Sequence, residues 1–275
     1  MSLVRGCHIV VKIDGAPLHD AKARDRIAAD LVWLTELGVR ALVVHGGGPH
    51  ISAMLDRLGI KSRFVRGQRY VDEAVLEVVE MVLGGAVNKA LVRTIAARGG
   101  RAVGLTGVDA RMAVAEQGRD DEDLGLVGYR PVFDTILLRQ LPAEVIPVLA
   151  PLAASSQGQL LSVDAADFAA RLAADLAADK LVMVTDVPGV RGRSGRILPT
   201  ITADQARALI ADGVVDSAVV SKVEQALDAL QRGVKKVHII DGRRPHALLV
   251  ELFSRSGIGT EVIARFPDTP GTTAL

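Results

Sequence analysis

Lys12 is the first residue of the chain whose chemistry contrasts with its surroundings. It lies inside the apolar, β-branched run at residues 8–13, and Gly15 follows closely. A lysine in a buried strand costs desolvation free energy unless its ammonium group meets an anion. Alternatively, the apolar stem is buried and the ammonium group reaches solvent at the rim of the sheet. The spacing leaves both interpretations open, and the first makes Lys12 a candidate anion-binding residue.

Three glycine-containing turns each follow an apolar run. They are Asp14-Gly15, Gly46-Gly47-Gly48 and Asp186-Val187-Pro188-Gly189. Glycine lets backbone N–H groups approach an anion, and a helix that begins after such a turn adds partial positive charge. The dinucleotide fingerprint and the P-loop pattern are absent, since Pro49-His50-Ile51-Ser52 follows the glycine triplet. The sequence therefore disfavours a Rossmann dehydrogenase and a P-loop kinase.

Two other polar segments, the histidine pair and an acidic segment, are predicted to lie outside the chemistry of a site. His45 and His50 have neither helical-pair spacing nor the supporting cysteines of a zinc site. Residues 109–132 contain an acidic run at 120–123 and several turn residues. We expect exposed hairpins and a solvated acidic loop there, outside any site.

The elements that must position these residues alternate along the chain. Apolar strand-like runs recur, and amphipathic helical segments lie between them, so the sequence predicts an α/β protein: a three-layer αβα sandwich with a mainly parallel central sheet. Ligands should bind at the carboxyl ends of its strands. Without a composition break, we expect a single domain over 1–275, divided functionally into 1–180 and 181–275. The predicted strands are 8–13, 39–45, 102–105, 146–150, 181–185 and 236–240, and the predicted helices are 21–37, 51–58, 74–98, 165–178, 203–211 and 221–232.

Composition excludes several classes of function. The 275 residues include 49% hydrophobic residues and carry a formal net charge of +1. This balance gives no support to nucleic-acid or membrane binding, and a small molecule or another subunit is the expected partner. The single cysteine, Cys7, excludes an internal disulfide and is predicted to be a buried thiol. With no apolar run of membrane-spanning length and no signal-peptide pattern, we expect a cytoplasmic protein.

Motifs along nearly the whole chain are similar to those of the acetylglutamate kinases, within the amino-acid kinase family. This resemblance implies the three-layer sandwich and the transfer of the ATP γ-phosphate to the side-chain carboxylate of N-acetyl-L-glutamate, towards arginine or ornithine. The motifs are Val11-Lys12-Ile13-Asp14-Gly15, Val43-Val44-His45-Gly46-Gly47-Gly48-Pro49, Gly67-Gln68-Arg69-Tyr70, Gly104-Leu105-Thr106-Gly107-Val108-Asp109, Gly125-Leu126-Val127-Gly128, Ile146-Pro147-Val148, Thr185-Asp186-Val187-Pro188-Gly189-Val190, Lys222-Val223 and Gly257-Ile258-Gly259-Thr260.

The resemblance also assigns roles to individual residues. Lys12 and Lys222 match two lysines that stabilise the transferring phosphoryl group. Arg69 matches an arginine that clamps the α-carboxylate of the substrate. ATP would be accompanied by Mg²⁺, which keeps most of its ligands from phosphates and water, with no metal ligand assigned to the protein. The remaining matches are Gly47, Gly48 and Ser162 for substrate, and Gly15, Asp186, Val187, Pro188 and Gly189 for nucleotide.

Departures from the family pattern fall at these same places. Asp14 stands where the family has the first of two glycines, which brings a carboxylate near the phosphoryl path. Ser162 replaces a substrate-binding asparagine, and Ala166 replaces an aspartate that orients the two lysines. Asp164 or Asp167 could substitute for that aspartate. Ser217-Ala218 replace a glycine pair before Lys222.

Three functions follow from the sequence. The first is an acetylglutamate kinase or a kinase of a close acylamino-acid analogue. The second is a kinase for a glutamyl or aminoadipyl group on a carrier protein, for which Lys61, Arg63 and Arg66 could form a basic groove. The third is a catalytically weakened homologue that binds nucleotide or amino acid. Arginine-inhibited family members carry an extra N-terminal helix that joins dimers into hexamers, and since the first predicted strand begins near His8, we expect a homodimer.

Overall fold

A single eight-stranded sheet runs through the centre of the protein. The computed structural model describes residues 6–118, 123–254 and 256–266. Neighbouring strands are parallel except for the antiparallel β13–β14 pair, and β1 joins the two predicted halves by pairing with β2 on one side and β11 on the other. In spatial order the strands are β12 (Thr200–Thr202), β14 (Thr260–Ile263), β13 (Lys236–Asp241), β11 (Lys180–Thr185), β1 (His8–Ile13), β2 (Arg40–His45), β8 (Val145–Ala150) and β5 (Arg101–Thr106).

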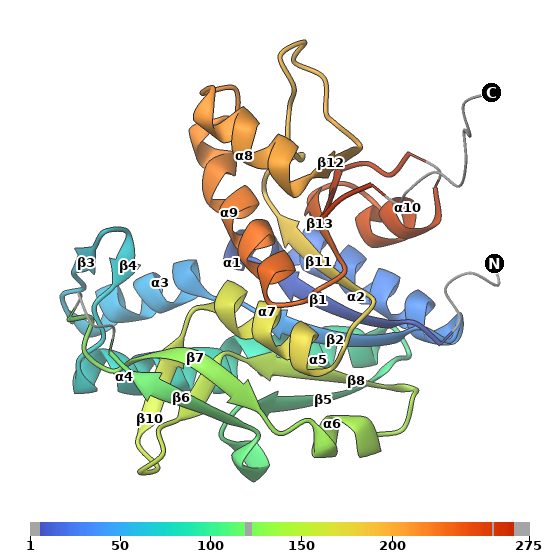
Figure 1. Cartoon of the computed structure of the whole chain (residues 1–275). Coiled ribbons are helices and arrows are strands. Elements are labelled where there is room, and N and C mark those ends of the chain that lie inside the picture. Colours follow the sequence, from blue (N-terminus) through green and yellow to red (C-terminus); the bar gives the residue numbers. More distant parts are fainter. Residues whose placement is uncertain (1–5, 119–122, 255, 267–275) are drawn as a thin grey trace, which may run out of the picture.

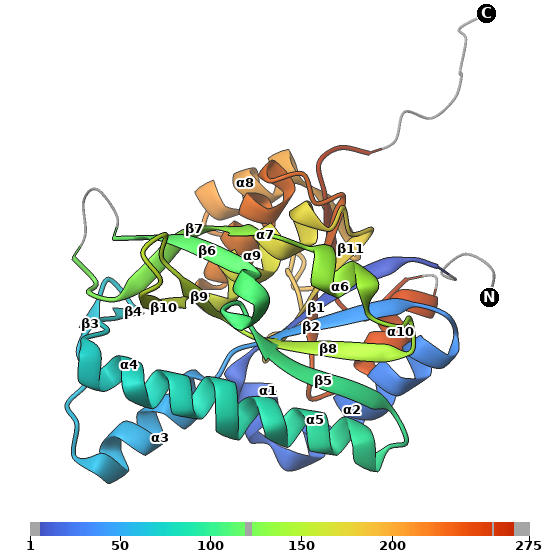
Figure 2. The same cartoon turned by 90° about the horizontal axis from the view of Figure 1, so that it is seen from below.

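Helices cover both faces of this sheet, which confirms the predicted sandwich (Figures 1 and 2). Because side chains alternate along a strand, Ile9, Val11 and Ile13 of β1 enter one core and Val10 enters the other. Lys12 shares the face of Val10. The first face carries α1 (Gly15–His19), α2 (Ala21–Glu36), α3 (Gly48–Leu58), α4 (Glu73–Glu80), α5 (Asn88–Ala97) and α10 (Ala247–Phe253); the second carries α7 (Ala165–Asp175), α8 (Ala203–Ala211) and α9 (Ser217–Gln231).

A small closed barrel stands beside α7, in a region predicted to hold only hairpins and a polar loop. Its strands are β6 (Ala113–Gln117), β7 (Val127–Phe133), β9 (Leu152–Ala154) and β10 (Leu160–Val163). The β6–β7 pair is antiparallel, as expected of a hairpin. Residues 120–122 of the acidic run lie outside the described residues. The remaining elements that the sequence analysis missed are α1, the hairpin β3 (Phe64–Val65) and β4 (Gln68–Arg69), the helix α6 (Ile136–Gln140), α10, β12 and β14.

The long helix predicted for 74–98 is built from three segments. Between α4 and α5 the backbone forms a π-helix, η1 (Met81–Val87), which contains the Gly84-Gly85 pair. A π segment adds a residue per turn and reorients the side chains that follow it. Leu83 of this segment packs at the glycine triplet, where its Cδ2 would lie 2.5 Å from a Cβ added to Gly47. The helix therefore shapes one wall of the space above β2.

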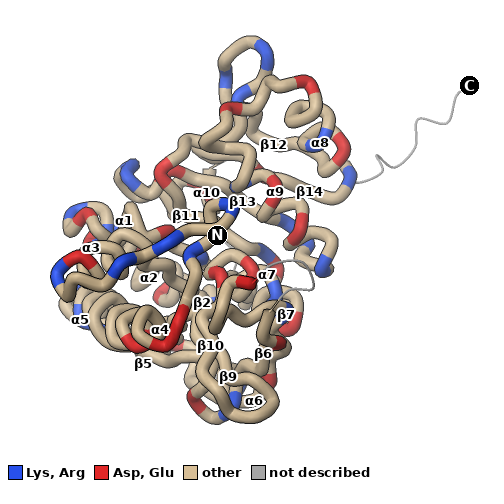
Figure 3. Tube along the Cα trace, turned by 90° about the vertical axis from the view of Figure 1, so that its left-hand side faces the viewer, with Lys and Arg blue, Asp and Glu red and all other residues tan. Residues whose placement is uncertain are grey.

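Surface charge is mixed rather than concentrated. In the view of Figure 3, segments of Lys and Arg and segments of Asp and Glu are both scattered over the trace, in line with the net charge of +1. Attraction for a charged ligand must therefore come from local groups. Cys7, which was predicted to be buried, is half-buried and immediately precedes β1. None of the helices in the described part of the chain combines the length and apolarity needed to cross a bilayer.

Candidate active site

A large cavity lies at the carboxyl ends of β1, β2 and β11, where the sequence analysis expected the ligand. Its volume is about 1120 Å³. The strands end there in the three predicted turns, and α7 and α9 close the cavity from the second face of the sheet. Most of the predicted site residues contribute to its wall: Lys12, Asp14, Gly15, Gly47, Gly48, Arg69, Ser162, Asp164, Asp167, Asp186 and Lys222.

Lys12 and Lys222 meet at one carboxylate, that of Asp14. Lys12 is only 4% exposed, and its Nζ contacts Asp14 Oδ1. Lys222 reaches the same group from α9, with Nζ 2.8 Å from Asp14 Oδ2. α9 begins at Ser217, four residues before its predicted start, so Lys222 lies in the second turn rather than at the helix end. The ammonium group of Lys12 therefore meets an anion and does not extend to solvent.

Asp14 is ionised in this arrangement. Burial by itself would raise the pKa of its carboxyl, but the charges of Lys12 and Lys222 and their hydrogen bonds outweigh burial and lower that pKa. The side chain of Asp14 is 15% exposed. Together, the two ammonium groups and the carboxylate carry a net charge of +1, which suits a phosphoryl group held directly beside them.

The glycine triplet forms the floor of the cavity beneath the start of α3. Gly47 is the N-cap of that helix, and Pro49 occupies its first turn. Gly15 packs directly against this turn, because an added Cβ would lie 2.7 Å from Pro49 Cδ and 3.2 Å from the Gly48 nitrogen. The turn that contains Gly15 and the glycine triplet come so close that small residues are needed there. The lack of side chains keeps their backbone N–H groups accessible to an anion.

His45 supports the triplet from below and has the structural role predicted for it. It is fully buried, with Nδ1 3.1 Å from the Gly46 carbonyl oxygen and Nε2 3.2 Å from Asn88 Nδ2. Burial lowers the pKa of His45 to about 4. A neutral ring that donates from Nδ1 and accepts at Nε2 satisfies both contacts.

Arg69 faces the cavity from the β3–β4 hairpin. Its Nη2 donates to Ser52 Oγ of α3 at 2.8 Å, and its Nη1 donates to Ser62 Oγ. The guanidinium also stacks on the Phe64 ring, 4.8 Å from the centroid. These contacts fix the plane of the guanidinium while leaving other N–H donors for a carboxylate.

The two aspartates considered for orienting the lysines have other partners. Asp164 is the N-cap of α7 and accepts from the backbone N–H groups of Ala166 and Asp167. Asp167 forms an ion pair with Arg232, the C-cap residue of α9, with 2.6 Å between Oδ1 and Nη2. The carboxylate that contacts both lysines is that of Asp14.

The turn Asp186-Val187-Pro188-Gly189 follows β11, and two threonine hydroxyl groups accept hydrogen bonds from the backbone in and directly after it. Thr185 Oγ1 accepts from the Val187 N–H at 3.0 Å, and Thr260 Oγ1 accepts from the Val190 N–H at 2.8 Å. Gly189 has φ of +116°, and a Cβ there would lie 2.8 Å from Thr260 Oγ1. Pro188 and Gly189 also border a second cavity of about 750 Å³ near the start of α9.

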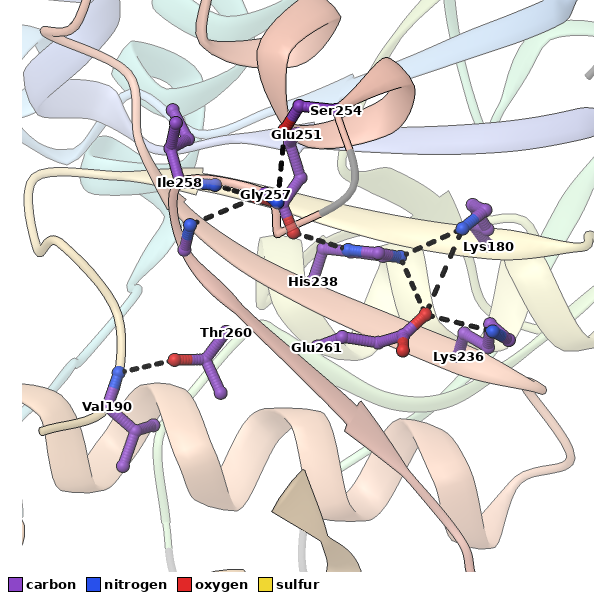
Figure 4. Close-up of polar contacts among 11 residues, drawn as sticks. Lys180, Val190, Lys236, His238, Glu251, Ser254, Gly257, Ile258, Thr260 and Glu261 are labelled. Atoms are coloured by element: carbon purple, nitrogen blue, oxygen red, sulfur yellow. Dashed lines mark hydrogen bonds and ion pairs between the residues drawn. The ribbon is translucent and has the colours of Figure 1, made fainter. Parts of the chain in front are cut away.

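A buried carboxylate fixes the segment that carries Thr260 (Figure 4). Glu251 Oε2 accepts from the backbone N–H groups of Ile258 and Gly259 at 2.7 and 3.0 Å. Its Oε1 lies 2.7 Å from His238 Nδ1. Glu251 is 7% exposed, and burial would raise its pKa, but the hydrogen bonds from His238 and the two amides lower it. The start of β14, and with it Thr260, is thereby held against the turn.

Comparison with known proteins identifies the family. The amino acid kinase family profile matches residues 8–241. This chain belongs to the amino acid kinase family. Acetylglutamate kinase from Bradyrhizobium diazoefficiens is 46% identical, over 92% of this chain and 90% of the relative. Acetylglutamate kinase from Methylobacterium nodulans is 44% identical, over 92% and 87% of the two chains. The resemblance inferred from the motifs is confirmed.

A solved structure supports the same fold. N-acetylglutamate synthase from Neisseria gonorrhoeae, in complex with coenzyme A and N-acetylglutamate, aligns with a TM-score of 0.84 and 29% identity. The alignment covers 95% of this chain and 60% of the synthase chain, so this chain spans less than two thirds of that protein.

One prediction about the site of this amino acid kinase was wrong. Residues 109–132 were expected to lie outside any site, yet Glu116, Gly118, Tyr129 and Arg130 line the cavity. Tyr129 OH lies 3.4 Å from Gln68 Oε1 on the hairpin that carries Arg69. The barrel brings β6 and β7 back to the site through pairings that no local pattern reveals.

The contribution of Arg232 to the cavity was also missed, although the helix predicted for 221–232 contains both Lys222 and Arg232.

The basic groove considered for a carrier protein is formed only in part. Arg66 lines the cavity, as does Arg130. Arg63 instead stacks on Tyr70, 3.7 Å from the ring centroid. Lys61 is exposed and does not contribute to the wall.

Proposed function

We propose that this protein is an ATP-dependent kinase that phosphorylates the side-chain carboxylate of N-acetyl-L-glutamate, for arginine biosynthesis. The observation that carries this proposal is the meeting of Lys12 and Lys222 in a cavity that also contains Arg69 and the glycine triplet. Relatives named acetylglutamate kinase, at 44–46% identity over 92% of the chain, support the choice of substrate.

The proposed reaction is a direct transfer. A side-chain carboxylate oxygen attacks the γ-phosphorus of ATP, the bond from that phosphorus to the β–γ bridging oxygen breaks, and ADP leaves. The attacking group is already ionised, so the reaction requires no general base. Negative charge spread over the phosphoryl oxygens in the transition state would be stabilised by Lys12 and Lys222.

Each end of the cavity would bind one substrate. Arg69 would clamp the α-carboxylate of N-acetylglutamate, and Ser162 and the amides of Gly47 and Gly48 would bind its polar groups. For ATP, we propose that the 186–189 turn and the second cavity beside it bind the nucleoside end, while Gly15 and the start of α3 approach the phosphates.

Mg²⁺ would enter with ATP. The described residues contain no group of three or more His, Cys, Asp or Glu arranged to hold a metal ion. We propose that Mg²⁺ keeps phosphate and water oxygens as most of its ligands. Mg²⁺ would offset phosphate charge while the two lysines hold the transferring group. We also propose a homodimer, and light scattering should give twice the 29.0 kDa chain mass.

A coupled ADP-release assay tests the proposed function. The acceptors are N-acetylglutamate, glutamate, N-acetylaminoadipate and carrier-linked glutamate or aminoadipate, each with Mg-ATP, and Lys12→Ala serves as the inactive control. We expect the highest kcat/KM with N-acetylglutamate. A preference for a carrier-linked group would favour the carrier-protein kinase, and nucleotide binding without turnover of any acceptor would favour the weakened homologue.

A further inference from the structure

Asp14 spans two cationic groups that come from different layers of the fold. Lys12 lies on β1 in the central sheet, and Lys222 lies on α9 of the helical layer above it. The side chains of Lys12, Asp14 and Lys222 are 5%, 15% and 19% exposed. Each carboxylate oxygen serves one lysine. This three-residue contact connects the sheet to the helix in the wall of the cavity.

We propose that Asp14 is a positioning residue that orients both Lys12 and Lys222 for phosphoryl transfer. The inference rests on the function proposed above and adds a role within the same site. Asp14 occupies the first position of the turn after β1, immediately before the helix α1.

The contacts of Asp14 indicate that it orients the two lysines rather than repelling the phosphate groups of the substrate. A free carboxylate in the phosphoryl path would repel the substrate, but both oxygens of Asp14 already face ammonium groups. Without this carboxylate, two ammonium groups would face each other in a partly desolvated space, and their repulsion would move the flexible side chains apart. Asp14 therefore allows two positively charged side chains to lie close together and to act on the same phosphoryl group.

The first turn of α7 offers a place to test this role independently. Ala166 lines the same cavity and is 7% exposed. The sequence resemblance places a lysine-orienting aspartate at this position. A carboxylate in the first turn is compatible with the helix because it interacts favourably with the N-terminal partial charge. Ala166→Asp can therefore supply a replacement carboxylate to the cavity after Asp14 is removed.

Kinetics of four variants test the proposal. Asp14→Asn keeps the shape of the side chain and should lower kcat by about 100-fold. Its KM for ATP should not rise, because a negative charge near the phosphates is lost. Asp14→Gly should show the same loss, and Asp14→Gly with Ala166→Asp should recover about a tenth of the wild-type kcat. The control Asp204→Asn removes an exposed carboxylate that pairs with Arg207, and its kcat should equal that of the wild type.

The contrary outcome is equally measurable. If Asp14→Gly or Asp14→Asn keeps the wild-type kcat or exceeds it, Asp14 does not orient the lysines and the proposal is overturned. Circular dichroism spectra and melting temperatures of the variants separate a loss of orientation from a loss of folded protein.

A second measurement does not depend on the substrate. Trace labelling with acetic anhydride reports how readily each lysine amine reacts, which depends on its ion pairs and on its access to the reagent. In Asp14→Asn, labelling of Lys12 or Lys222 should rise several-fold, while Lys89, whose Nζ donates to the Gly104 carbonyl oxygen at 3.0 Å, stays constant. Unchanged labelling of both lysines overturns the proposal. If the wild type fails to phosphorylate N-acetylglutamate, the proposed function fails, but this labelling still shows whether Asp14 holds the amines of Lys12 and Lys222.

Discussion

Replacing Thr260 by valine should weaken ATP binding from a distance. Thr260 Oγ1 accepts the Val190 N–H at 2.8 Å, and the side chains of both residues are fully buried (Figure 4). Valine has almost the same shape as threonine but lacks the acceptor oxygen. The Val190 N–H would then be left without a partner directly after the 186–189 turn, while the packing against Gly189 would be retained.

The size of the effect follows from that one hydrogen bond. Leaving a buried N–H group unsatisfied costs about 1–3 kcal/mol. Since 1.4 kcal/mol corresponds to a factor of ten, ordering the turn around the nucleotide should become about 5- to 140-fold less favourable. The KM for ATP should rise by this factor. The KM for N-acetylglutamate should remain nearly constant, because Arg69 is held by Ser52 and Ser62 on other elements.

Initial rates at varied ATP and at varied N-acetylglutamate, together with calorimetric titration of ADP, measure both constants. Thr94→Val is the matched control, since Thr94 Oγ1 donates to the Ala90 carbonyl oxygen within α5, and its KM for ATP should match the wild type. If Thr260→Val lowers the free energy of unfolding but leaves the KM for ATP and the ADP affinity unchanged, the bond stabilises the fold alone. The reasoning that connects β14 to the nucleotide turn would then be refuted.

Three further predictions concern the same cavity. Lys12→Ala and Lys222→Ala should each lower kcat by about 100-fold or more with smaller changes in KM, because both act on transition-state charge; steady-state kinetics with near wild-type kcat would make that lysine structural. Arg69→Lys should raise the KM for N-acetylglutamate by about tenfold or more and leave that for ATP unchanged, since an ammonium cannot form the planar two-point contact; equal changes in both constants would reject the assignment. Burial lowers the pKa of His45 from 6.5 to about 4, so between these values the unfolded chain binds a proton that the native protein does not. Stability should therefore fall as pH decreases from 6.5 towards 4, by up to about 3 kcal/mol from this residue. Urea unfolding at pH 7 and pH 4.5 measures this loss, and a loss of equal size in His45→Gln would exclude His45 as its source.

Six of the eight strands of the central sheet could be predicted because they are continuous apolar runs, whereas the short strands β12 and β14 were missed. β1 was placed at its observed bounds, and β2 and β11 were placed within one residue. The same signal located the cavity, since parallel strands present their carboxyl ends at one edge. Lys12, the glycine triplet and the 186–189 turn each lie at or directly after the carboxyl end of a predicted strand. Their place relative to the strands was therefore enough to predict that they lie at the same edge of the sheet.

The small barrel could not be predicted from local patterns. β9 and β10 have three and four residues, and β10 pairs in parallel with β7, more than 20 residues earlier in the chain. Such short strands are stabilised by long-range pairing rather than by their own periodicity. For this reason the contributions of Tyr129 and Arg130 to the cavity were missed.

The contact made by Asp14 also depended on three-dimensional placement. The sequence showed a carboxylate two residues after Lys12, but its distance to Lys222 depends on how α9 crosses the sheet. α9 begins at Ser217, so Lys222 lies in its second turn rather than at its end. The contact of Asp14 with both lysines is therefore visible only in the folded structure.

Oxygen tracing tests the proposed carboxyl phosphorylation most directly. N-acetylglutamate labelled with ¹⁸O at both side-chain carboxylate oxygens is incubated with the protein and Mg-ATP, and hydroxylamine then displaces phosphate from the acyl carbon. Direct attack of the carboxylate on the γ-phosphorus predicts that each released phosphate carries one ¹⁸O atom and that a hydroxamate forms in equal amount. Release of phosphate without ¹⁸O, with no hydroxamate, would show hydrolysis of ATP by water and contradict the proposed function.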